Sequence, residues 1–167
     1  SPDNHIVFID GIAGTGKTFI SASWGLGELI KGNFDKMIIT RPYVEAGENL
    51  GFLPGTFDDK IAPFMIPITD VFNEHLTDSM VKDLVEERKI ITLPLAYMRG
   101  VTFKKSFVIL DEAQMLPTGY LLPCLAALSE LVRNYGSTVL ICTATQPKLG
   151  DLLDKSIRPV EIIDSPD

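Results

Sequence analysis

The chain has 167 residues, of which 46% are hydrophobic, so it is long enough to bury a core as one domain, and intrinsic disorder is excluded. Its formal net charge of −7 argues against a broadly basic nucleic-acid-binding surface, so any contact with a strand would depend on a few placed basic residues. No apolar run is long enough to span a bilayer, which excludes a membrane-spanning helix.

The first predicted elements are a strand, a glycine-rich loop and a helix. Ile6–Ile9 is an apolar run typical of a buried strand, and a helical pattern runs from Gly16 to about Lys31. The loop matches the phosphate-binding pattern G-x-x-x-x-G-K-[ST], so its backbone N–H groups and the helix N-terminus are expected to bind a nucleotide's phosphates. Lys17 is expected to reach the β- and γ-phosphates, and Thr18 to place its hydroxyl on Mg²⁺. The residues of the motif are Gly11, Ile12, Ala13, Gly14, Thr15, Gly16, Lys17 and Thr18.

A second apolar run, Met37–Thr40, predicts the next strand, and Arg41 follows it. Arg41 is a candidate contact for a nucleic acid phosphate, with a structural ion pair as the alternative. The Gly- and Pro-rich stretch Pro42–Pro67 then interrupts the alternation of strands and helices. A helical segment over about Phe57–Val85, broken at two prolines, follows. We therefore predict an insertion over about residues 43–86.

Lys89–Leu93 predicts a third strand, and Phe107–Leu110 a fourth that ends in two acids. Ligands of parallel sheets bind at the carboxyl ends of the strands, so these acids are expected at the site. Asp111 is the candidate metal ligand, acting through water, and Glu112 the candidate catalytic carboxylate that orients or deprotonates the attacking water. Acidic residues after strands are common. The interpretation of this pair as a metal and water site depends on the phosphate-binding loop earlier in the chain.

The last predicted elements are a helix over Leu121–Tyr135 and a strand over Thr138–Cys142, followed by a weaker strand over Val160–Ile163. The helix has apolar residues at helical spacing, which predicts packing on the sheet, and Pro123 is expected in its first turn. The residues at this spacing are Leu121, Leu125, Leu128, Val132 and Tyr135. If the strand ending at Cys142 lies between the first and fourth strands, Gln146 would face the γ-phosphate as a third catalytic candidate. A polar turn with a helix cap is the alternative for that segment.

Together these patterns predict an α/β fold with a mostly parallel sheet and helices on both faces, forming a single P-loop NTPase domain over residues 1–167. Cys124 and Cys142 are expected to be buried reduced thiols, and the histidines lack the spacing of a zinc site. Ser1–Asn4 carry no export signal, so we expect a cytoplasmic protein without a membrane partner. No N-K-x-D segment is present, which favours ATP over GTP.

Residues 6–114 resemble the PhoH-like family of P-loop ATPases. The resemblance is carried by GIAGTGKT (Gly11–Thr18), ITRPYVEAGENLGFLPG (Ile39–Gly55), PLAYMRG (Pro94–Gly100) and FVILDEAQ (Phe107–Gln114). It implies a RecA-like sheet and ATP hydrolysis associated with RNA or with helicase-like work. It also implies the nucleotide loop, the pair Asp111 and Glu112, and Arg41 as part of a loop beside the strand.

Residues 111–167 differ from the PhoH-like pattern and resemble the first motor domain of the CRISPR-associated helicase-nuclease of type I systems. There, motifs corresponding to Asp111–Gln114 and Thr143–Gln146 (TATQ) act in a DNA-translocating motor. Both families share the DEAQ quartet. We therefore interpret the chain as a natural or constructed chimera joined near that quartet, with a divergent natural protein as the alternative.

The expected function is that of a Mg²⁺-dependent ATPase domain linked to single-stranded RNA or DNA. Motors of this type hydrolyse ATP between two RecA-like domains, and the second domain supplies an arginine. Without that domain we expect weak activity, unless a homo-oligomer supplies Arg99, Arg133 or Arg158 from a neighbour. The alternatives are a nucleotide-dependent binding module without significant hydrolysis and, less favoured, a small-molecule phosphotransferase.

Overall fold

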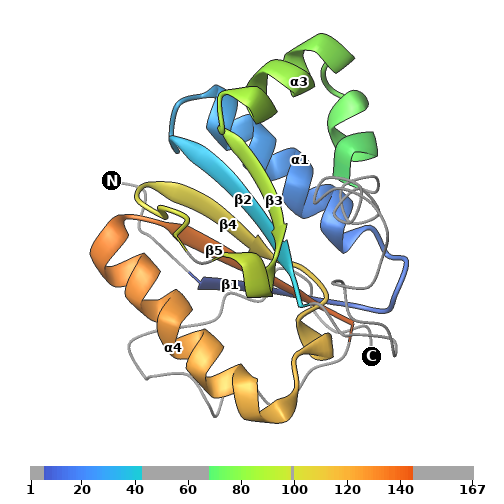
Figure 1. Cartoon of the computed structure of the whole chain (residues 1–167). Helices are drawn as coiled ribbons and strands as arrows, with labels where there is room; N and C mark the ends of the chain where they lie inside the picture. The colour runs from blue at the N-terminus through green and yellow to red at the C-terminus, as the bar shows by residue number, and fades with distance from the viewer. Residues whose placement is uncertain (1–5, 43–67, 99, 145–167) are drawn as a thin grey trace, which may run out of the picture.

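The computed structural model describes residues 6–42, 68–98 and 100–144. Within these ranges a five-stranded sheet has the order β1-β5-β4-β2-β3, and every neighbouring pair is parallel (Figure 1). This confirms the predicted α/β fold with a parallel sheet. The strands are β1 (Ile6–Asp10), β2 (Lys36–Arg41), β3 (Ile90–Pro94), β4 (Ser106–Leu110) and β5 (Thr138–Thr143).

Five of the predicted strands are present, each within one residue of its expected bounds, and the sixth, Val160–Ile163, lies outside the described residues. These five apolar segments form strands because helices cover both faces of the sheet. In β4, Phe107 and Ile109 join the apolar cluster on one face, and Val108 and Leu110 join the cluster on the other. A strand that is buried on both faces has apolar residues at successive positions instead of an alternation of apolar and polar residues.

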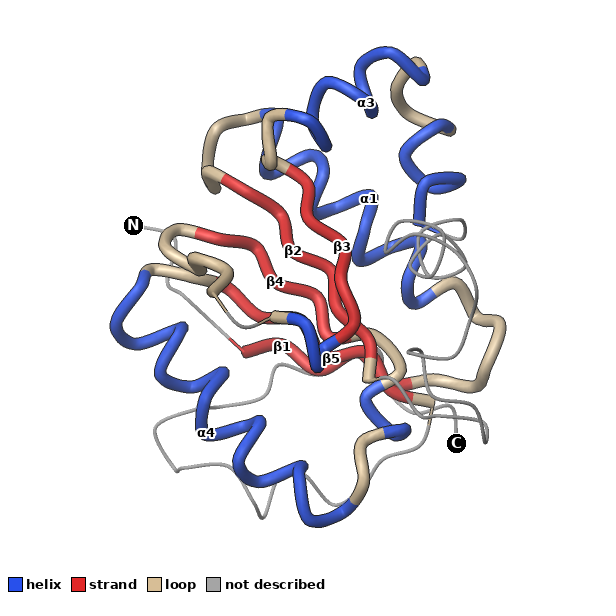
Figure 2. Tube along the Cα trace, in the orientation of Figure 1, coloured by secondary structure: helices blue, strands red, loops and turns tan. Residues whose placement is uncertain are grey.

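The helices divide between the two faces of the sheet. α1 (Lys17–Ile30) and α3 (Asp78–Glu86) lie over one face and α4 (Thr118–Tyr135) over the other, as Figure 2 shows. Two short 3-10 helices, η2 (Leu95–Tyr97) and η3 (Ala113–Met115), follow β3 and β4. None of the helices in the described ranges is long and apolar enough to cross a membrane.

The long helical segment expected before β3 differs from the prediction in its described part. Residues 68–73 form one helix and α3 a second, while residues 57–67 lie outside the described residues. The break falls before Thr77, whose side chain caps α3 by accepting a hydrogen bond from the N–H of Met80 at 3.4 Å. A local side-chain cap therefore divides the segment at a point where the sequence has no proline.

The predicted packing of α4 is confirmed at Leu125, Leu128 and Val132, which are buried against the sheet. It is wrong at Tyr135, which is 50% exposed because the helix ends there and Gly136 turns the chain with a φ of 64°. Pro123 lies inside the helix rather than in its first turn, because α4 begins earlier than expected, at Thr118.

Gly25 allows α1 to pack closely on β4, which leads to a first testable prediction. A Cβ at Gly25 would lie 2.6 Å from ring atoms of Phe107 and 2.9 Å from the Cε of Met37. We expect Gly25→Ala to lower the free energy of unfolding by roughly 1–3 kcal/mol, since an overpacked core must move. Gly27→Ala is the matched control, because its Cβ meets nothing within 4 Å and should stabilise the helix slightly.

Urea unfolding followed by circular dichroism measures both variants. If Gly25→Ala is as stable as Gly27→Ala, the close approach of α1 to β4 is contradicted.

The sheet brings the motif residues to one edge. The strands are all parallel, so their carboxyl ends meet there. β1 leads into the glycine-rich loop, β2 ends at Arg41, and β4 leads into Asp111. β5 lies between β1 and β4, as the proposed position of Gln146 requires. Gln146 itself lies outside the described residues.

Candidate nucleotide-binding site

The loop between β1 and α1 forms an open cradle of backbone groups. Gly14 and Gly16 both have a φ of 83°, which glycine adopts at little cost, and a Cβ at either would meet nothing within 4 Å. Gly16 caps α1 without a side-chain hydrogen bond, which leaves first-turn N–H groups available to an anion. The N–H of Gly11 donates to Asp10 Oδ1 at 2.8 Å, and Thr15 Oγ1 donates to the Ile12 carbonyl at 2.8 Å.

The side chain of Lys17 lies across this loop. Its Nζ donates to the carbonyl oxygens of Gly11 at 2.6 Å and Ile12 at 2.9 Å. These contacts hold the ammonium group at the loop. Phosphate oxygens are stronger acceptors than neutral carbonyls, so the group could exchange these partners for a bound phosphate.

Thr18 and Asp111 meet although they are 93 positions apart in the chain. Thr18 Oγ1 donates to Asp111 Oδ1 at 3.0 Å and to Oδ2 at 2.9 Å. The backbone N–H of Asp111 donates to the Thr40 carbonyl at 2.8 Å, which anchors the acid at the end of β4. The sheet thus places a hydroxyl and a carboxylate together at the end of the glycine-rich loop.

This donor set fits Mg²⁺ and does not resemble a cage made by protein alone. Within the described ranges no group of three or more His, Cys, Asp or Glu side chains could hold a metal ion. Mg²⁺ is usually bound by one or two protein oxygens, with water and substrate phosphates completing the shell. Thr18 and Asp111 supply hard oxygen donors of this kind beside the phosphate cradle.

Arg41 forms an ion pair with the same carboxylate. Its Nε donates to Asp111 Oδ2 at 2.8 Å, and its Nη2 lies 2.7 Å from that oxygen. The Asp111 side chain is 2% exposed and that of Arg41 21%. Of the two interpretations that the sequence left open for Arg41, the structure displays the ion pair. A nucleic-acid contact stays a prediction.

The ion pair leads to a second prediction. Arg41→Ala leaves a buried carboxylate without its cation, and removing one partner of such a pair costs roughly 3–5 kcal/mol. We expect a fall in Tm of about 10 °C, because 1 kcal/mol shifts Tm by roughly 2–4 °C in a domain of this size. Lys82→Ala is the control, since its pair with Glu86 at 3.7 Å is exposed on both sides.

Scanning calorimetry of both variants gives the comparison. An equal Tm for Arg41→Ala and Lys82→Ala would show that the ion pair between Arg41 and Asp111 does not contribute to the stability of the protein.

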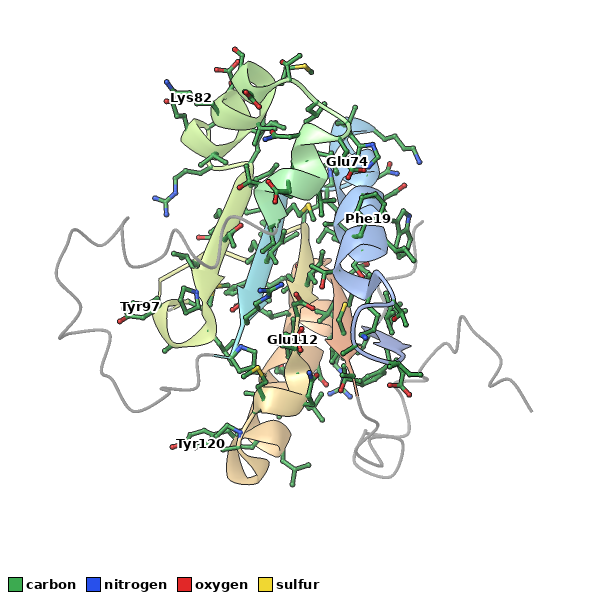
Figure 3. All side chains as sticks on the ribbon, turned by 90° about the vertical axis from the view of Figure 1, so that its right-hand side faces the viewer. Phe19, Glu74, Lys82, Tyr97, Glu112 and Tyr120 are labelled. Atoms are coloured by element: carbon green, nitrogen blue, oxygen red, sulfur yellow. The ribbon has the colours of Figure 1, made fainter. Side chains whose placement is uncertain are left out.

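Glu112 lies directly after Asp111 at the same end of the sheet, far from Lys82 on α3 (Figure 3). Its backbone is left-handed, with φ 53° and ψ 40°, a conformation that costs a non-glycine residue free energy and is concentrated at functional positions. Its carboxylate accepts a hydrogen bond from the side-chain amide of Gln114. The side chain is partly exposed, so it could contact a water molecule.

Cys142 faces α1 near the site but is not suited to act as a nucleophile. Its Sγ lies 3.2 Å from Ser21 Oγ, and burial raises the pKa of the thiol to about 12. Burial also raises the pKa of Cys124, which is only half-buried. Both are free thiols, and the thiol of Cys142 is protonated at neutral pH.

The structure thus brings Lys17, Thr18, Asp111 and Glu112 to one edge and adds two residues whose contact partners the sequence did not identify. A nucleic-acid contact and a structural ion pair were both open for Arg41, and its ion-pair partner is Asp111. Gln114 received no role, although it belongs to the DEAQ quartet that both resemblances share. The shared DEAQ quartet was the sequence signal that could have indicated a role for Gln114.

The family comparison is consistent with this geometry. A family model described as PhoH-like protein matches residues 2–129. A PhoH-like protein of Synechocystis sp. is 48% identical over 111 residues, which are 66% of this chain and 34% of that protein. Protein PhoH of Escherichia coli (strain K12) is 42% identical over 130 residues, which are 77% of this chain and 37% of that protein. The chain therefore spans about a third of the length of these curated relatives.

A comparison with solved structures concerns the fold alone. The N-terminal domain of the DNA packaging ATPase from bacteriophage phi29 superposes with a TM-score of 0.53 at 15% sequence identity. The match covers 97% of this chain and 87% of that chain. The chain therefore shares an α/β fold with that ATPase domain.

Proposed function

The chain belongs to the PhoH-like protein family, and on that basis we propose that it binds ATP with Mg²⁺ on the loop Gly11–Thr18 and hydrolyses it. The observation that carries the proposal is the contact of Thr18 with both carboxylate oxygens of Asp111, at 3.0 and 2.9 Å. It joins the phosphate-binding loop to the acid after β4, which is the pairing that a nucleoside triphosphate with Mg²⁺ needs.

Each residue has a distinct part in the proposal. Backbone N–H groups from Ile12 to Thr18 bind the phosphates, and Lys17 turns from its carbonyl partners to the terminal phosphates. Thr18, and Asp111 through water, would hold Mg²⁺, which would neutralise charge on the phosphate oxygens. Glu112 orients the attacking water and accepts its proton. Gln146 is proposed to face the terminal phosphate.

We further propose a link to single-stranded RNA or DNA, as the family resemblance implies, and a cytoplasmic location. Arg41 is the candidate strand contact at the site. Its guanidinium is engaged by Asp111, so strand binding through Arg41 would require that ion pair to open or to be shared.

A binding module without significant hydrolysis is the second candidate, and the arginines favour it. In the described part of the chain, Arg41 is the arginine that contacts the site acids, and it is paired with Asp111. Arg133 lies on α4 and is 4.0 Å from Glu130, while Arg99 and Arg158 lie outside the described residues. An arginine supplied by a neighbouring copy or by another domain would increase the turnover.

The resemblance of residues 111–167 to a CRISPR-associated helicase-nuclease, and the chimera it suggests, stay proposals. The PhoH-like match continues to residue 129, past the DEAQ quartet and into α4. Leu125 and Leu128 of α4 belong to the same apolar cluster as Ile38 of β2 and Val108 of β4, so the two parts of the chain share one apolar cluster.

Phosphate release tests the proposed function. The rate is measured with ATP and Mg²⁺, with and without single-stranded RNA or DNA, and with EDTA as the metal-free control. We expect a slow, Mg²⁺-dependent rate that a strand increases. ATP binding with a rate equal to that of buffer would favour the binding module, and no binding would reject both.

A further inference from the structure

The side-chain amide of Gln114 makes two hydrogen bonds of opposite kind. Its Nε2 donates to Glu112 Oε2, and its Oε1 accepts from the backbone N–H of Ala144 at 3.0 Å. These partners fix the orientation of the amide, because exchanging its O and N atoms would set acceptor against carboxylate and donor against N–H. Gln114 is therefore a defined bridge between two segments 30 positions apart.

The backbone at this bridge is tightly organised. Glu112 is left-handed and starts η3, in which the N–H of Met115 donates to the Glu112 carbonyl at 2.9 Å. Ala113 is buried in the apolar cluster beneath α4 and anchors this turn. A strained residue between a buried strand and an anchored turn has little freedom in its backbone. The direction of its carboxylate then depends on side-chain contacts, of which the structure shows Gln114.

The second contact leads to β5. Ala144 follows the last residue of β5, the strand that lies between β1 and β4. Through Gln114, the carboxylate after β4 is thus connected to the backbone that emerges from the neighbouring strand. Gln146, the residue proposed to face the terminal phosphate, comes two positions after Ala144 in the sequence.

From these contacts we propose that Gln114 is a positioning residue, which directs the Glu112 carboxylate and ties its position to the end of β5. The inference rests on the proposed function, since it acts through Glu112. Gln114 does not touch ATP in this account. Its loss should lower kcat and leave ATP binding unchanged, because the nucleotide is held by the loop after β1 and by Asp111.

Two variants separate the two contacts. Gln114→Leu has similar size and loses both hydrogen bonds. Gln114→Glu keeps an acceptor for the N–H of Ala144 but places a carboxylate against Glu112 instead of a donor. We expect a roughly 10- to 100-fold lower kcat in both variants, the range in which misplacing a reacting group lowers rates. KM and the Kd for ATP should stay within about twofold of wild type.

The control breaks a similar contact away from the site. The Asn134 side-chain amide donates to Glu130 on α4, and Asn134→Leu should retain wild-type kcat. Single-turnover phosphate release from radiolabelled ATP measures slow rates, and isothermal titration measures Kd. Amide exchange at Ala144, followed by NMR, should be faster in Gln114→Leu than in Gln114→Glu, and thermal melts establish that each variant is folded.

The outcomes distinguish this inference from the function on which it rests. If Glu112→Gln is inactive while Gln114→Leu has wild-type kcat, the inference is overturned and the proposed function stands. A wild-type kcat in Gln114→Glu would also overturn the inference, because the contact with Ala144 alone would then be enough for full activity. If Gln114→Leu does not fold, the result for Gln114→Glu decides the question alone. A wild-type rate no higher than that of Glu112→Gln would overturn the proposed function and this inference together.

Discussion

Lys17→Ala is expected to abolish ATP binding while leaving the domain folded. Hydrogen bonds between charged groups contribute roughly 1.5–3 kcal/mol each, so losing an ammonium that contacts two phosphates should weaken binding by about 100-fold or more. In the structure the amine contacts the carbonyl oxygens of Gly11 and Ile12 at the loop and is not part of the core. Removal of the amine should therefore lower the affinity for ATP while changing the free energy of unfolding much less.

Isothermal titration with ATP and Mg²⁺ measures this effect. Lys31→Ala is the matched control, because Lys31 caps the other end of α1 and its pair with Glu28 at 2.9 Å is exposed on the lysine side. We expect wild-type affinity for Lys31→Ala and no measurable heat for Lys17→Ala. Equal isotherms for wild type and Lys17→Ala would remove the lysine from the site.

Glu112→Gln should keep ATP binding and lose hydrolysis. The amide has the size of the carboxylate and its oxygen can still accept from Gln114, so the local geometry is retained. It cannot accept a proton from water, and general-base catalysis contributes roughly 10²- to 10⁴-fold to a rate. We expect phosphate release to fall by that factor.

The control for Glu112→Gln is Glu86→Gln, which makes the same chemical change at an exposed position of α3. Phosphate release and the Kd for ATP are measured on all three proteins. Unchanged phosphate release in Glu112→Gln would mean that another group activates the water.

The sheet could be predicted from the sequence because strands that are buried on both faces appear in it as continuous apolar runs. β2, β4 and β5 are short runs of apolar residues with almost no polar interruption, and their bounds agree with the prediction within one residue. The helix ends were harder to predict. α4 begins at Thr118, and Pro123 is accommodated inside it, because the sheet on which α4 packs stabilises the helix beyond its local propensity.

The meeting of Thr18 and Asp111 followed from two separate motifs and the rule that strand ends share an edge. The partners of Arg41 and Gln114 could not be predicted in this way. Which acid an arginine pairs with depends on strand order, and β2 lies beside β4 only in the folded sheet. The bridge from Gln114 to Ala144 likewise depends on β5 lying next to β4.

The most direct test of the account is a crystal structure with Mg²⁺ and a non-hydrolysable ATP analogue. We expect the triphosphate in the loop Gly11–Thr18, Mg²⁺ on Thr18 Oγ1, and Lys17 moved from the carbonyls of Gly11 and Ile12 to the phosphates. A folded protein with an empty loop at saturating analogue, or with the analogue bound elsewhere, would contradict the account.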